Sequence, residues 1–79
     1  MNYDEWFIQA LISIDSKVKT GQSFEVRSLF DGIKWNTLSA GEKKSFGRYF
    51  ANAVREGSIK GVVKSGENKQ HHTTYIKVW

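Results

Sequence analysis

The chain begins with a strong helical pattern, in which apolar residues recur at intervals of three and four positions. The stripe consists of Tyr3, Trp6, Phe7, Ala10, Leu11, Ile14 and Val18. Asn2, followed three residues later by Glu5, resembles a capping box at the start of this helix. Ile8 and Ile12 lie off the stripe and widen the predicted buried face, and Thr20-Gly21-Gln22 ends the helix.

Another helical pattern covers Ala40–Glu56. Its apolar stripe consists of Phe46, Tyr49, Phe50, Ala53 and Val54. Ser39 and Glu42 have the spacing of a capping box before it, and Gly57 is the expected stop after it. These local signals predict a long, well-bounded helix in the second half of the chain.

The remaining segments predict strands and a short helix. Ser23–Arg27 alternates apolar and polar residues and predicts a short strand, and Ser28–Trp35 predicts one or two helical turns. Ile59–Lys64 and Thr73–Trp79 are the predicted arms of a hairpin, joined by the polar residues 65–72. Because so short a first strand is not stable alone, we expect it to pair with the hairpin in a three-stranded sheet.

Alternation along the last arm assigns its residues to two faces. It predicts that Ile76 and Val78 face inward, and that Tyr75, Lys77 and Trp79 lie on the other side.

The order helix, strand, helix, helix, strand, wing, strand is that of a winged helix-turn-helix domain. We therefore predict a single α+β domain over residues 1–79, with a three-stranded antiparallel sheet. In this fold Ser28–Trp35 is the first helix of the helix-turn-helix and Ala40–Glu56 is the recognition helix. Residues 65–72 form the tip of the wing.

Composition excludes several classes of protein. The 79 residues contain no cysteine, so the chain has no disulfide and no thiolate metal site. No apolar run approaches the roughly 20 residues of a membrane span, and no signal-peptide pattern is seen, so we expect a cytoplasmic protein without membrane contact. His71 and His72 are adjacent without a supporting acidic cluster, and we predict neither a metal nor a cofactor.

No group of residues indicates catalysis. Asp4 and Glu5 are consecutive helical residues that do not converge, and Ser39 is explained by its capping position. No glycine-rich phosphate loop is present, and we do not expect an enzyme.

Charge is distributed unevenly. Residues 1–42 contain four Lys/Arg and six Asp/Glu, whereas residues 43–79 contain eight and two. A basic half on a small domain indicates a polyanionic partner. The plainer interpretation is a solvated basic surface.

The polar face of the predicted recognition helix combines cations with very small residues. Lys43 and Lys44 lie in the predicted first turn, where a positive charge is unfavourable because of the helix dipole. Near phosphates, however, lysines at a helix N-terminus add to the attraction of the dipole. Glycine in a helix interior is about 1 kcal/mol less favourable than alanine. The close approach of another surface would explain why Gly47 is present in this helix. Packing of Gly47 against the core helix is the alternative. Arg48 and Asn52 are residue types that bond guanine and adenine edges.

A second basic set lies on the hairpin, namely Lys60, Lys64, Lys69 and Lys77, with His71 and His72. Convergence of helix and hairpin predicts a nucleic-acid-binding face. Its candidate residues are Lys43, Lys44, Arg48, Asn52, Arg55, Lys64 and Lys69.

The chain resembles winged-helix proteins, and it is similar to small uncharacterised domains of Gram-positive bacteria and their phages or mobile elements. Leu29-Phe30, Trp35–Leu38, Gly41–Phe50 and Ile59–Val78 carry this resemblance. It implies a DNA-binding scaffold, although winged helices also serve as protein-interaction modules. Glu67 and Asn68 depart from a purely basic wing and weaken the expected phosphate contacts of its tip.

Two main hypotheses follow. The first is a small nucleic-acid-binding protein, such as a transcriptional regulator, for which duplex DNA is the expected ligand and RNA is an alternative. The second is an adaptor or inhibitor that offers the same basic face to an acidic protein. Self-association through Ile8 and Ile12, or through Trp79, would give a homodimer with two DNA half-sites.

Overall fold

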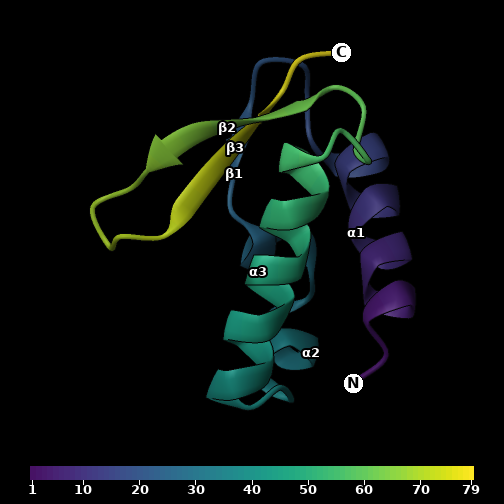
Figure 1. Cartoon of the computed structure of the whole chain (residues 1–79), viewed down its shortest axis with the longest axis vertical. Helices are drawn as coiled ribbons and strands as arrows, with labels where there is room; N and C mark the ends of the chain where they lie inside the picture. Colours follow the sequence, from purple (N-terminus) through teal and green to yellow (C-terminus); the bar gives the residue numbers. More distant parts are fainter.

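The computed structural model covers residues Met1–Trp79 and consists of three α-helices and a three-stranded antiparallel sheet (Figure 1). The helices are α1 (Tyr3–Lys17), α2 (Gly32–Asn36) and α3 (Ala40–Arg55). The strands are β1 (Ser23–Phe24), β2 (Val62–Glu67) and β3 (Thr73–Lys77), and a 3₁₀ turn, Val26–Leu29, follows β1. The predicted α+β class and three-stranded antiparallel sheet are confirmed. No helix combines the length and the apolar character that crossing a membrane requires.

Both long helices begin at the residues that the sequence predicts. The Asn2 side chain accepts a hydrogen bond from the Glu5 backbone N–H at 3.1 Å. In α3 the capping box is complete, because Ser39 Oγ accepts from the Glu42 N–H while Glu42 Oε1 accepts from the Ser39 N–H. The bond from the Ser39 backbone holds the pKa of Glu42 below its ordinary value.

The sheet has the order β1-β3-β2, so the last strand lies in the centre. β1 is shorter than the predicted Ser23–Arg27 strand, because the chain leaves the sheet after Phe24 and turns to bury Leu29. The β2–β3 hairpin projects from the helices, and α3 lies between it and α1 (Figure 1).

The predicted faces of the last strand are wrong. Tyr75 and Lys77 are buried, whereas Ile76 is only partly buried and Val78 is exposed. The reason for Tyr75 is its large ring, which packs edge-on against Phe50 with the centroids 5.1 Å apart. Burial raises the pKa of its hydroxyl.

Lys77 is buried because its ammonium group caps the end of α1. Its Nζ donates hydrogen bonds to the carbonyl oxygens of Val18 at 2.9 Å and Ile14 at 3.1 Å. These carbonyls lie at the C-terminal end of α1, which favours a positive charge; the Ile14 carbonyl also accepts from the backbone N–H of Val18. The Trp79 ring covers the same Nζ, 4.0 Å from its centroid. Lys77 therefore does not belong to the basic surface that the sequence predicts on the hairpin.

The core lies where α1 and α3 pack together over the sheet. Ala10 and Phe50 are fully buried in it, and Ile14 is nearly so. Towards the start of α3, Phe46 meets the edge of Phe30, and Phe30 stacks on Trp35. This aromatic packing holds α2 against the start of α3.

Candidate nucleic-acid interface

An open groove of about 540 Å³ separates α3 from the hairpin. The residues that line it on α3 are Lys43, Lys44, Gly47 and Ala51. The residues that line it from the hairpin and from the segment after β1 are Glu25, Val26, Arg27, His72, Thr73 and Tyr75, and Trp35 adds a ring from α2. We call this feature the α3–hairpin groove.

The position of Gly47 answers a question that the sequence leaves open. A Cβ atom at this residue would meet no heavy atom within 4 Å. Gly47 is therefore not required for packing against another helix, and that alternative is wrong. Its missing side chain leaves space in the α3–hairpin groove.

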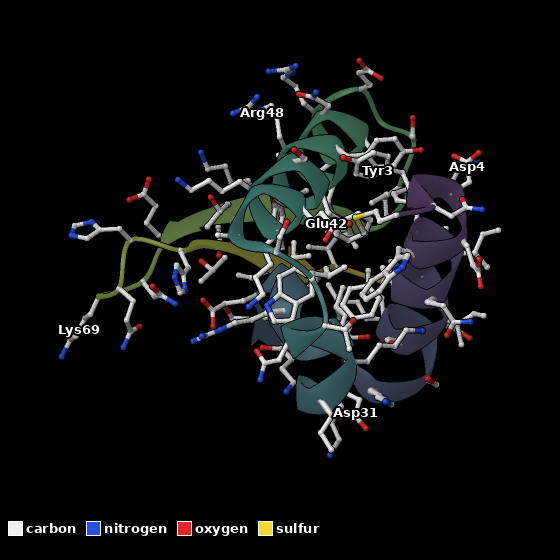
Figure 2. All side chains as sticks on the ribbon, turned by 90° about the horizontal axis from the view of Figure 1, so that it is seen from below. Tyr3, Asp4, Asp31, Glu42, Arg48 and Lys69 are labelled. Atoms are coloured by element: carbon white, nitrogen blue, oxygen red, sulfur yellow. The ribbon has the colours of Figure 1, made fainter.

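The sides of α3 have different roles. Phe46 and Phe50 face the core and are fully buried. At about 100° per residue, Gly47 and Ala51 lie on the neighbouring side, which lines the groove. Arg48 follows next around the helix and is exposed (Figure 2).

The structure places two of the predicted residues in the groove and the others at various distances around it. Lys43 and Lys44 line the groove itself. Lys64 is opposite Tyr75 in the hairpin register, and directly opposed residues share a face, so it lies on the side that faces α3. Lys69 lies at the far tip of the hairpin (Figure 2). Arg55 is exposed in the last turn of α3, more distant from the groove than the lysines.

These cations have no acidic partners. Of the 12 lysines and arginines, only Arg27 forms a salt bridge with a carboxylate. The closest polar partner of Lys43 Nζ is Asn36 Oδ1, at 3.5 Å. The charge of the surface is therefore not neutralised within the molecule.

Asn52 differs from the other candidates because its side chain is already engaged. Its Oδ1 accepts a hydrogen bond from Arg55 Nη2 at 2.7 Å. The bond links two successive turns of α3 on the exposed side.

A polar network at the hairpin wall of the groove was not predicted. Glu25 Oε1 accepts from Asn68 Nδ2 at 2.8 Å and lies 2.7 Å from His72 Nδ1. Glu25 Oε2 accepts from Arg27 Nε at 3.1 Å. Burial raises the pKa of Glu25, but the hydrogen bonds from Asn68, His72 and Arg27, with the charge of Arg27, outweigh it and leave the pKa below its ordinary value. We call these residues the Glu25 network.

The Glu25 network holds the hairpin turn in place. Asn68 Oδ1 accepts from the backbone N–H groups of Gln70 and His72, and His71 has a left-handed backbone with φ 65°. Asn68 thus shapes the turn, and its bond to Glu25 fixes the turn beside β1. No linear pattern reveals this arrangement, because its members lie 43 and 47 residues apart in the chain.

Comparison with known proteins identifies a family. Searches of curated proteins and of solved structures find no match. A family model described as "Domain of unknown function (DUF1413)" matches residues 9–77, which include α3, the hairpin and the groove between them. The chain belongs to this DUF1413 family.

Proposed function

We propose that this protein is a winged helix-turn-helix module that binds duplex DNA. In this proposal α2 and α3 form the helix-turn-helix, α3 is the recognition helix, and the β2–β3 hairpin is the wing. The element order and the antiparallel sheet with its projecting hairpin support the proposal.

The observation that carries the proposal is the α3–hairpin groove. Cations without acidic partners lie at its edge, and the residues that line it on α3 include very small ones. Lys43 and Lys44 are at its edge, and Gly47 and Ala51 leave room for a close approach. A phosphodiester strand has the charge and the narrow cross-section for this space. The lysines would then neutralise its phosphates, and the positive end of the α3 dipole would add to their effect.

Orientation follows from the charge distribution. Lys69 at the tip of the hairpin lies far from Asp4 at the start of α1, and Arg48 projects between the two (Figure 2). In this proposal α3 approaches the major groove and the wing, whose tip lies away from the acidic start of α1, extends along the backbone. Such separation of charge steers the encounter as well as the bound state.

The test replaces both Arg48 and Arg55 by Glu and measures fluorescence anisotropy with a random 20-base-pair duplex. Neither residue is in the core, so the circular dichroism spectrum should be unchanged while binding is lost. For a parent that makes about four phosphate contacts, the slope of log affinity against log salt should be near −3.6.

A charge-matched control separates this site from a general effect of net charge. Lys17→Glu with Lys19→Glu makes the same change of charge at exposed positions near the end of α1. The control should retain most of the affinity of the parent. Equal affinity for the Arg48/Arg55 variant and the parent would show that the exposed side of α3 with these two arginines does not contact DNA.

A protein-interaction module is the second candidate, favoured by the apolar part of the groove. Val26, Trp35 and Tyr75 also line it, and a phosphate strand makes little use of such groups. Absence of binding to duplex, single-stranded DNA and RNA at tens of micromolar protein, near physiological salt, would favour an acidic protein partner that inserts apolar side chains.

A further inference from the structure

We infer that His72 is a further phosphate-binding residue of the α3–hairpin groove and that it contacts DNA only in its protonated form, so that affinity rises as the pH falls. This inference rests on the proposed function and adds a residue to the same site. It follows from the bond between His72 and Glu25 and from the position of the histidine in the groove.

His72 is placed to meet the strand that the lysines of α3 attract. Its side chain lines the groove together with Lys43 and Lys44, and 47% of it is exposed. The Asn68 side chain accepts from the His72 backbone N–H at 3.1 Å, and Nδ1 of the ring lies 2.7 Å from Glu25 Oε1. The ring is therefore held at the hairpin wall before any ligand arrives.

The bond to Glu25 decides which ring nitrogen carries the proton. Although burial raises it, the pKa of Glu25 lies below its ordinary value because of the hydrogen bonds that it accepts and the charge of Arg27. At neutral pH this group is an ionised carboxylate, which only accepts hydrogen bonds. Nδ1 of His72 must therefore be the donor, and Nε2 of the neutral ring is left without a proton.

Protonation changes what the other side of the ring can do. The two nitrogens lie on different sides of the imidazole, so Nε2 is directed away from Glu25, and no group of the protein bonds it. In the neutral ring Nε2 is an acceptor, like the oxygens of a phosphate, and forms no bond with them. In the protonated ring it becomes a charged donor, while Nδ1 keeps its bond to Glu25. Contact with a phosphate thus requires the protonated form.

The surrounding charges act on this protonation in opposite directions. Ionised Glu25, in contact with the ring, favours the charged form. The cations that also line the groove disfavour it, namely Arg27, Lys43 and Lys44. Burial raises the pKa of the Tyr75 hydroxyl, which stays neutral. A phosphodiester strand offsets the cations, so bound DNA and a proton on the ring favour each other.

The experiment measures duplex affinity by fluorescence anisotropy between about pH 6 and about pH 8, at constant salt. A histidine changes charge in this range, and uptake of one proton limits the change in affinity to about tenfold per pH unit. We expect the parent to bind roughly three- to tenfold more tightly at the lower pH than at the higher. His72→Gln keeps a donor for Glu25 and should lose this dependence.

The adjacent histidine provides the matched control. His71 does not line the groove, its side chain is 89% exposed, and its left-handed backbone accommodates asparagine. His71→Asn should keep the pH dependence of the parent. An α-amino group also titrates in this range, but the Met1 amino group, 3.5 Å from Glu42, is the same in every variant, so its effect cancels.

A purely structural role for His72 would not produce these results. Nitrogen NMR of the free protein at about pH 8 should find the proton of the neutral ring on Nδ1, and a proton on Nε2 would overturn the inference. So would a pH dependence that survives in His72→Gln or disappears in His71→Asn, or an affinity of the parent that does not change with pH. Failure to bind duplex at any pH would instead remove the proposed function itself.

Discussion

Gly47→Ala should make this protein more stable and a weaker DNA binder. Gly47 lies in the interior of α3, and a Cβ atom there would meet nothing within 4 Å. The substitution therefore has no steric cost in the free protein, and it restrains the unfolded chain. A gain of roughly 0.5–1 kcal/mol in the free energy of unfolding follows. At about 4–8 °C per kcal/mol for a domain of this size, the melting temperature should rise by about 2–8 °C.

Binding should change in the opposite direction. A side chain at residue 47 projects into the α3–hairpin groove, where we propose that a phosphodiester strand lies. Leu at this position remains a good helix former but fills more of the space. A clash comparable to overpacking a core costs about 1–3 kcal/mol, which is about 5- to 150-fold in affinity. Affinity should thus fall in the order Gly, Ala, Leu while stability does not fall.

Urea denaturation and duplex anisotropy on the same samples provide the assay. Gln9→Leu is the matched control, because it adds the same side chain at an exposed position of α1. That control should leave the affinity unchanged. If Gly47→Leu folds normally and binds duplex as tightly as the parent, no DNA strand approaches this part of the helix. If Gly47→Ala is instead less stable, the space beside Gly47 is occupied.

Further predictions concern the packing around β3 and the Glu25 network. Lys77→Met should lower the free energy of unfolding by about 1–3 kcal/mol, because the Val18 carbonyl at the end of α1 loses its donor and the Ile14 carbonyl loses one of two; an unchanged urea midpoint would contradict this capping role. Gly61→Ala should be strongly destabilising, because φ is 75° and the new methyl group would overlap the Trp79 ring. Adding Trp79→Ala in a double-mutant cycle should relieve the overlap but leave a backbone cost of about 1–2 kcal/mol; purely additive effects would rule out the steric explanation. The folded pKa of Glu25 lies below the ordinary value of about 4.3, so its stabilising contribution is complete above about pH 5 and is lost as the pH falls through the folded pKa. The parent should therefore lose more stability than Glu25→Gln between about pH 5 and pH 3 in urea titrations, and equal losses would show that Glu25 makes no net contribution.

The helices could be predicted because their determinants are local. The Asn2 and Ser39 caps act within one turn, and each apolar stripe is visible in its own segment. The faces of β3 could not be predicted in this way, because alternation separates two sets of residues without showing which set is buried. A lysine normally marks the solvent side. Lys77 reverses that rule because carbonyl oxygens of α1, 59 and 63 residues earlier in the chain, receive its ammonium group.

The residue types of the candidate interface could be predicted from the sequence. The positions of their side chains and their hydrogen bonds could not. Charge asymmetry and the small residues of α3 indicated the surface, yet only the structure shows that Lys43 and Lys44 border an open groove. The engagement of Asn52 depends on the rotamer of Arg55, which sequence does not specify. Glu25 and His72 were missed because long-range pairing of single polar residues leaves no periodic signal.

Residues on one side of α3 are unfavourable for helix formation, whereas those at its start and on its core side are favourable. The start of the helix has a complete capping box, and the core side buries Phe46 and Phe50 fully. The groove side, in contrast, has lysines at the positive end of the dipole and a glycine in the helix interior, and both choices reduce helix stability. Packing does not require this glycine, since a Cβ at Gly47 would have open space. In a domain that is otherwise locally consistent, unfavourable choices concentrated on one open surface are what the proposed ligand, which requires charge and close approach there, would explain.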